Sequence, residues 1–311
     1  MDTYPIAAQS LEKFYLINGK QLEFHYKEHL SDFRNLEEKE HADKWLVFPE
    51  NIGGHISIDE TSLSDGDLYT IVTNKEKKCK KRALIAIVKG TVSKDVIKAL
   101  EKIPEDKRNL FKETTLDMSN SMDNIIRASF KNSDLVIYRF HVQKLVNDAL
   151  QELRISTRWE TIDEETKKHE IAKETNTKYV EEILQNGDTR KQLLARSRYL
   201  LFKSSDKWTE SQKIRAKILF ELYPDIKKAY SLAHSLRIIY SKPHDKITGK
   251  ESLMRWYDKV KEANFESFKT IVKTIKQHED EILNFFIKRD INALAESFNA
   301  TIIDVKNNCV C

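Results

Sequence analysis

His55-Ile-Ser-Ile-Asp59-Glu-Thr-Ser-Leu-Ser64 is the stretch on which the fold of this chain depends. Apolar and polar residues alternate along it, as they do in a β-strand, and the expected strand brings Asp59 to its carboxyl end. Two further segments repeat the pattern, and turn-forming or charged residues bound each of them. The sequence therefore predicts three consecutive strands, at about 55–60, 67–74 and 83–89.

Asp117 stands at the end of a fourth predicted strand, Phe111-Lys-Glu-Thr-Thr-Leu-Asp117. A short helix at 94–102 precedes this strand, and Ser93 can cap the first turn of that helix. The pattern then predicts a helix, a fifth strand and another helix, at 120–130, at 134–138 and from His141 onward.

This element order is that of an RNase H-like core, in which the first and fourth strands are parallel neighbours. The connection between them passes through a helix, as a parallel crossover requires. Neighbouring strands lie about 4.8 Å apart, and ligands of α/β sheets gather at the carboxyl ends of the strands. We therefore expect Asp59 and Asp117 to lie close enough to share a metal ion.

The remainder of the chain is helical in pattern, with further helices expected at 163–184, 189–203, 209–222, 224–240, 250–262 and 265–288. Thr248-Gly249 is expected to interrupt this helical block. The predicted fold class is an α/β RNase H-like core with a mixed five-stranded sheet, interrupted by a large all-α insertion. The expected domains are an N-terminal helical segment, the first part of the core, the insertion and a C-terminal core helix, at 1–54, 55–145, 146–288 and 289–311.

The composition excludes several classes of protein. Apolar residues make up 40% and charged residues 33% of 311 residues, and no run approaches the roughly 20 apolar residues that span a bilayer. No secretory signal is evident, so we expect a cytoplasmic protein without a membrane partner. Cys309-Val-Cys311 could be half of a metal site, but a frayed tail is the favoured interpretation.

The distribution of basic residues is more informative than the net charge of +4. Nine Lys or Arg residues stand against three Asp or Glu residues between positions 190 and 221. Such a cluster can follow a phosphate backbone, although a solvated helix face has the same composition. The candidate phosphate contacts are Arg190, Arg196, Arg198, Lys203, Lys213, Arg215 and Lys217.

A third carboxylate comes late in the chain, on a helix predicted at 291–303. Glu296 shares one face of that helix with Asn292 and Asn299. Together with Asp59 and Asp117 it makes a trio of hard oxygen ligands that suits two Mg²⁺ or Mn²⁺ ions. On a regular strand Glu60 points away from Asp59, which excludes it from this trio. Taken singly, each acid is more readily interpreted as an ordinary surface charge, and it is the order of the three within these elements that favours a metal site.

The chain resembles, over nearly its whole length, the DDE transposases of bacterial insertion sequences, most closely the ISL3 type. The motifs that carry the resemblance are Ile58-Asp-Glu-Thr-Ser62, Leu68-Tyr-Thr-Ile-Val-Thr73, Thr115-Leu-Asp-Met-Ser119, Val136-Ile-Tyr-Arg-Phe-His-Val-Gln-Lys144 and Asn292-Ala-Leu-Ala-Glu-Ser-Phe-Asn299.

The resemblance implies metal-dependent cleavage at the element ends and strand transfer into target DNA by a DDE mechanism. Asp59, Asp117 and Glu296 would be the catalytic and metal-binding residues, and His141 and Asn299 would contact DNA. The implied partners are the insertion-sequence ends and the target DNA, with a homo-oligomer assembled on them. A separate polypeptide could supply the helix-turn-helix that residues 1–54 do not show.

Two departures from the family pattern lead to an alternative hypothesis. Tyr138 stands where the family has an acidic residue three positions before His141, and the residues up to Cys311 do not continue the family's basic tail. We therefore expect a truncated copy of reduced activity, and the alternative is a remnant that only binds DNA. A helical scaffold protein with an incidental acidic sheet edge is the third hypothesis.

Overall fold

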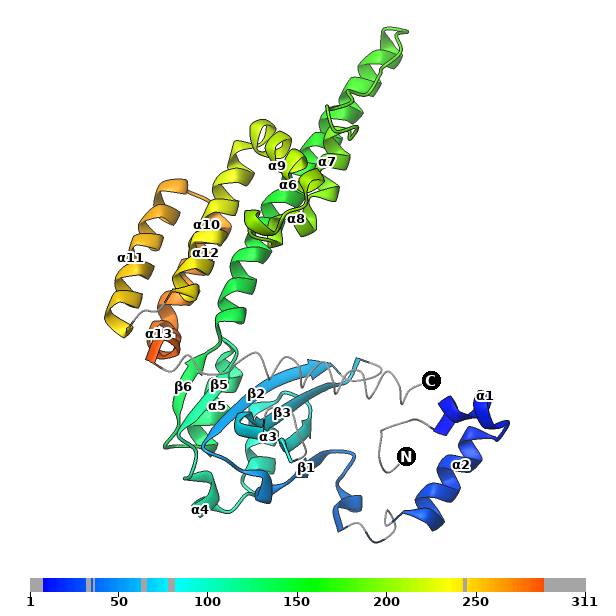
Figure 1. Ribbon diagram of the computed structural model, residues 1–311, viewed down its shortest axis with the longest axis vertical. Helices are drawn as coiled ribbons and strands as arrows, with labels where there is room; N and C mark the ends of the chain where they lie inside the picture. The colour runs from blue at the N-terminus through cyan, green and yellow to red at the C-terminus, as the bar shows by residue number, and fades with distance from the viewer. Residues whose placement is uncertain are drawn as a thin grey trace. The chain divides into compact units, whose positions relative to one another are not determined.

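The computed structural model describes residues 8–31, 35, 37–62, 66–77, 82–242 and 245–287 of the chain (Figure 1). The chain divides into two compact units, of which the first extends to Tyr138 and the second covers Arg139–Ile287. The first unit contains the sheet, and the second unit is built from helices. Within the described ranges, no helix combines the length and the apolar character needed to cross a membrane.

A mixed sheet of six strands forms the centre of the first unit, in the order β1-β4-β3-β2-β5-β6. Strands β1, β4, β3 and β2 pair antiparallel, whereas β2, β5 and β6 pair parallel. The predicted parallel pairing of the first and fourth core strands is thus confirmed by β2 and β5. The strands are β1 Trp45–Val47, β2 His55–Ser62, β3 Leu68–Asn74, β4 Leu84–Lys89, β5 Glu113–Leu116 and β6 Asp134–Ile137.

The predicted count of five strands is wrong by one, because the sequence analysis missed β1. This strand has three residues, all half-buried, so it is too short for an alternation of apolar and polar positions to show. It pairs with β4 through Trp45 and Val88 at one end and through Val47 and Ala86 at the other. The segment 1–54, expected to be helical, therefore contributes the edge strand of the sheet.

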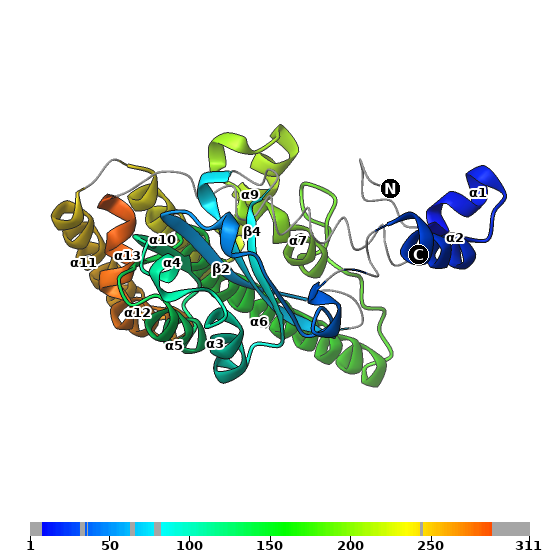
Figure 2. The same cartoon turned by 90° about the horizontal axis from the view of Figure 1, so that it is seen from below.

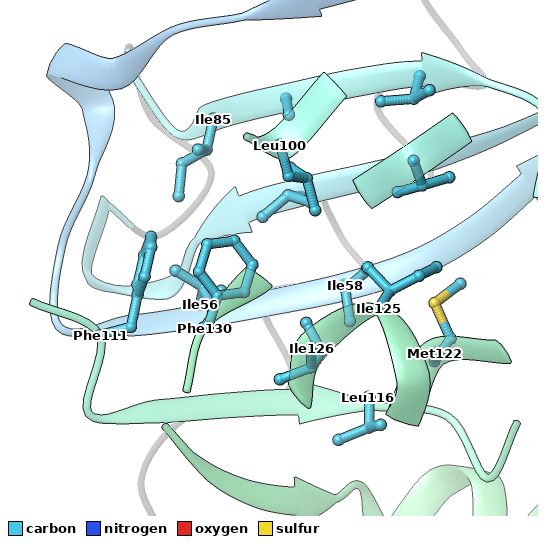
Figure 3. Packing of buried hydrophobic residues seen from close by; sticks show 14 of the residues in the cluster. Ile56, Ile58, Ile85, Leu100, Phe111, Leu116, Met122, Ile125, Ile126 and Phe130 are labelled. Carbon is cyan, nitrogen blue, oxygen red and sulfur yellow. The ribbon is translucent and has the colours of Figure 1, made fainter. Parts of the chain in front are cut away.

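Helices α3 (Ser93–Leu100) and α5 (Asn120–Ser129) lie beside each other and supply the apolar layer on one face of the sheet (Figure 2). Figure 3 shows how Ile56 and Ile58 of β2 meet the side chains of α5 in this core. Successive side chains of a strand point to opposite faces. The residues between and after these two isoleucines, Ser57 and Asp59, therefore belong to the other face.

The remaining elements of the first unit are short. At the start of α2, the Asn18 side chain accepts a hydrogen bond from the backbone N–H of Gln21 and caps the helix. The elements are the α-helices α1 Glu12–Tyr15, α2 Gly19–His25 and α4 Glu105–Arg108, the π-helical turn η2 Tyr26–Leu30, and the 3-10 turns η1 Ala8–Leu11, η4 Glu37–Glu40, η5 Pro49–Asn51 and η7 Lys75–Lys77.

The second unit begins with α6, a continuous helix of 36 residues. The sequence analysis placed separate helices in this region, the second at 163–184, and that division is wrong. No Gly or Pro occurs within α6 to break it, and the chain leaves the helix just before Asn176, which has a φ of 52°. The helices are α6 Arg139–Glu174, α7 Arg190–Arg196, α8 Arg198–Phe202, α9 Glu210–Leu222, α10 Pro224–Ser241, α11 Lys246–Ala263, α12 Glu266–Gln277 and α13 Glu279–Ile287, with a 3-10 turn η8 at Ser205–Lys207.

Gly249 lies inside α11, although the sequence analysis expected a helix break there. A Cβ atom at this position would lie 2.7 Å from the ring of Phe286 in α13, so only glycine allows the two helices to approach this closely. The same helix carries Trp256, which is 1% exposed and donates a hydrogen bond from Nε1 to the carbonyl oxygen of Leu232 in α10. Close packing therefore outweighs the low helix propensity of glycine.

Candidate functional site

Asp59 and Asp117 lie level with each other on neighbouring parallel strands. The last described pair between β2 and β5 is Ser57 with Thr115, and each aspartate stands two residues further along its own chain. Both side chains are half-buried. The structure therefore brings the two predicted aspartates to one end of one sheet.

The strand that carries Asp59 does not end at this residue, which corrects the expected boundary. β2 continues to Ser62 because its pairing with β3 extends as far as Leu68. β5 ends at Leu116, so Asp117 is the first residue beyond its strand. One aspartate is therefore held within a paired strand and the other by the turn that leads into α5.

Backbone amides orient both carboxylates. The N–H of Glu60 donates a hydrogen bond to Oδ1 of Asp59 at 2.9 Å, and the N–H of Met118 donates one to Oδ1 of Asp117 at 2.5 Å. These two contacts fix the orientation of the two side chains at neighbouring positions.

Glu60 lies in the negative field of this pair. Burial raises the pKa of its carboxyl, and the charges of Asp117 and then Asp59 raise it further. The side chain is exposed and sits in the regular part of β2, on the opposite pleat from Asp59. Three carboxyl groups therefore concentrate negative charge at this end of the sheet, a condition that favours a bound cation.

We expect the substitution Asp117→Asn to lower the pKa of Glu60, because the Asp117 charge raises that pKa more than the Asp59 charge does. The pKa should stay above its ordinary value, since burial is the leading cause of the shift. A titration of the side-chain carboxyl carbons of Glu by NMR measures the effect. The matched control is Asp134→Asn at the start of β6, which should leave the Glu60 titration unchanged.

The donor set of this site fits a hard divalent cation, to which Asp and Glu oxygens are the usual protein ligands. Within the described ranges, no group of three or more Asp, Glu, His or Cys side chains is arranged to hold a metal ion. Glu296 and Asn299 lie outside the residues that the structure describes. The two aspartates and the raised pKa of Glu60 are the features that agree with such a cation.

A buried ion pair joins Lys75, in the turn after β3, to Glu113 of β5, and the sequence analysis missed it. The Lys75 ammonium lies 3.3 Å from Oε1 of Glu113 and donates a hydrogen bond to the Thr115 hydroxyl at 2.7 Å. Both charged side chains are almost fully buried, at 6% and 4% exposure. Burial lowers the pKa of Lys75, while the charge of Glu113 acts to raise it. Lys75 thus ties the turn after β3 to β5 through Glu113 and Thr115, four and two residues before Asp117.

Tyr138 and His141 flank the start of α6. Tyr138 follows β6 and is 7% exposed, so the residue that departs from the family pattern is buried in this chain. His141 lies in the first turn of α6, is half-buried, and has its ring 6.0 Å from the ring of Phe140.

The predicted phosphate contacts lie on the second unit, and four of the seven already have acidic partners. Asp188 is 1% exposed and binds both Arg196 and Arg215, the latter at 3.2 Å. Arg190 pairs with Glu182 and Lys213 pairs with Glu210. These four cations thus contribute to the structure of the unit itself.

The other three predicted cations are exposed. Arg198 lies over the ring of Tyr199 at 5.4 Å from its centroid. Neither Arg198 nor Lys203 nor Lys217 has an acidic partner in the described part of the chain. They are therefore the predicted cations whose charge is available to an anionic ligand.

Comparison with protein families identifies a match. The family model DDE_Tnp_ISL3, described as transposase, matches residues 56–310, which span Asp59, Asp117 and Glu296. A search of curated proteins finds no match for the chain.

Proposed function

Because the chain belongs to the ISL3 family of DDE transposases, we propose that it cleaves DNA at insertion-sequence ends and transfers the strands to target DNA. The observation that carries this proposal is the level placement of Asp59 and Asp117 on parallel neighbours β2 and β5. Carboxyl ends of such strands are where α/β sheets bind their ligands.

We propose that Asp59, Asp117 and Glu296 hold divalent ions, Mg²⁺ or Mn²⁺. Two such ions would polarise the attacking and leaving oxygens of a phosphoryl displacement. The protein contributes two aspartates oriented by backbone amides, on parallel strands whose backbone pairing sets their spacing. The role of Glu296 rests on the family motif around it.

The test is nicking of DNA that carries the element's own terminal repeats by the full chain, with Mg²⁺ or Mn²⁺ and with a chelator. Metal-dependent nicking supports the proposal. DNA binding without any metal-dependent nicking would instead favour the remnant hypothesis, in which the chain only binds DNA.

We further propose that Arg198, Lys203 and Lys217 contact DNA phosphates, because they are exposed and have no acidic partner in the described residues. Arg190, Arg196, Lys213 and Arg215 would have to exchange an existing partner for a phosphate. Long cations on helices suit the backbone and carry no base specificity. We propose His141 and Asn299 as DNA contacts because both stand in motifs that the chain shares with the family.

We expect the triple substitution to alanine at Arg198, Lys203 and Lys217 to weaken binding to all DNA sequences alike. The slope of log affinity against log salt should fall by about 3, because each phosphate contact contributes about 0.9. Fluorescence anisotropy over a salt series measures both quantities. Alanine substitution at Lys228, Lys250 and Lys269, which are paired with Asp225, Glu279 and Glu266, is the control of equal charge and should change the slope less. Loss of affinity for one sequence only would contradict backbone contacts.

We also propose that more than one copy assembles on DNA. Light scattering of the protein with and without a terminal-repeat duplex measures the stoichiometry. A complex with one copy per duplex end and no pairing of ends would contradict this proposal.

A further inference from the structure

A cavity of about 600 Å³ lies in the first unit between α3 and the β1–β4 edge of the sheet. Four lysines and two acidic residues line it, which gives an excess of positive charge. Trp45 and Val88, which pair across β1 and β4, form part of its wall. The lining residues are Lys44, Trp45, Val88, Lys89, Asp95, Lys98, Ala99, Glu101 and Lys102.

Three of these lysines are available to an anion. Lys89 pairs with Asp67 at 2.7 Å. Lys44, Lys98 and Lys102 are exposed, and none has an ion pair with an acidic residue of the described chain, including Asp95 and Glu101. Lys98 stands on α3 and Lys102 in the turn just after that helix, and both line the same cavity. Two cations on one wall can contact a phosphate backbone.

The wall of the cavity does not offer an aromatic face for a base. The Trp45 indole packs against the apolar core of the unit. The ring of His41 stacks on it, with the centroids 3.5 Å apart and the planes at 7°. Single-stranded nucleic acid is bound through bases stacked on accessible aromatic rings, so lysines without such a ring favour the sugar-phosphate backbone of a duplex.

The cavity lies at the same level of the sheet as the two aspartates. The strand register places Glu60 opposite Thr70, Thr70 opposite Val88, and Val88 opposite Trp45, in one row across β2, β3, β4 and β1. Three strand spacings separate β2 from β1, a distance of about 14 Å. This row shares the face of Ile56 and Ile58, whereas Asp59 lies on the other face of the sheet. The cavity would therefore take a stretch of DNA separate from the one at the aspartates.

We infer that this cavity is a second DNA-binding site, which takes the phosphate backbone of duplex DNA independently of sequence. The inference rests on the proposed function, since it presumes that DNA is bound at the aspartate end of the sheet. Phosphate contacts fix the register of a duplex without reading its bases. The cavity would thus position DNA that the protein does not recognise by sequence.

The test uses the full chain and a duplex of about 30 base pairs, three helical turns, of arbitrary sequence. The double substitution Lys98→Glu and Lys102→Glu should weaken binding and lower the salt slope by about 2. The matched control is Lys112→Glu with Lys131→Glu. These exposed lysines precede β5 and β6, at the opposite end of the sheet, and should change the slope less.

Trp45 provides a second measurement that does not depend on a charge change. Addition of the duplex should alter the tryptophan fluorescence of the parent chain, and Trp45→Phe should reduce that change while binding persists. Parental affinity and salt slope in the Lys98 and Lys102 variant would overturn the inference. Binding through the cavity by a chain that never nicks DNA would contradict the proposed function and leave this site standing.

Discussion

We expect Asp59→Asn and Asp117→Asn each to remove nearly all metal-dependent DNA cleavage while leaving DNA binding intact. Each substitution keeps the size of the side chain and removes one negative oxygen ligand. Metal ions supply several kcal/mol of transition-state stabilisation, and each 1.4 kcal/mol is a factor of ten in rate. We therefore expect a loss of about 10³-fold or more in the nicking rate. DNA affinity should stay equal or rise, because a negative charge leaves the phosphate site.

The control is Asp134→Asn, an exposed residue at the first position of β6 and hence at the other end of the same sheet. It should retain the nicking rate of the parent. Nicking close to the parental rate in either aspartate variant would remove that residue from the metal site. Glu296→Gln should show the same loss as the two aspartates, and this variant tests the residue whose role rests on its motif alone.

The level placement of Asp59 and Asp117 could be predicted from sequence because it depends on regular strand geometry. Alternation along residues 55–64 and 111–117 identified two strands, and the helix between them required a parallel crossover. That arrangement determines which residues are level, so Asp59 and Asp117 could be matched before their register was known. The exact ends of the strands could not be predicted, because pairing with β3 extends β2 past Asp59.

Other features depend on tertiary contacts and have no signal in a single sequence. β1 forms because its partner β4 lies beside it, and Gly249 stays helical because Phe286 packs against it. The division of the predicted basic cluster into paired and exposed cations also depends on the fold. It follows from the burial of Asp188, a residue that the sequence analysis did not single out.

Lys75 and Glu113 were missed for the same reason, and their pairing predicts the largest effect on stability. Lys75→Met removes the buried ammonium beside the Glu113 carboxylate, which keeps His55, whose Nδ1 lies 3.7 Å from Oε2, as a nearby basic group. Glu113→Gln leaves the Lys75 ammonium buried without its anion. Loss of one partner of a buried pair costs about 3–5 kcal/mol. We expect each single variant to lose this much stability in the first unit. Hydrogen exchange of the β2 and β5 amides reports on this unit alone.

The double variant Lys75→Met with Glu113→Gln separates the pairing from other effects of the substitutions. It buries no net charge, so it should be destabilised by clearly less than the sum of the single variants, with a coupling of about 1–3 kcal/mol. Lys89→Met is the control, because Lys89 and Asp67 form an ion pair that is about half exposed, at 46% and 48%. Such a pair contributes only about 0–1 kcal/mol. Additive losses in the Lys75 and Glu113 variants would show that the two charges stabilise the strands independently.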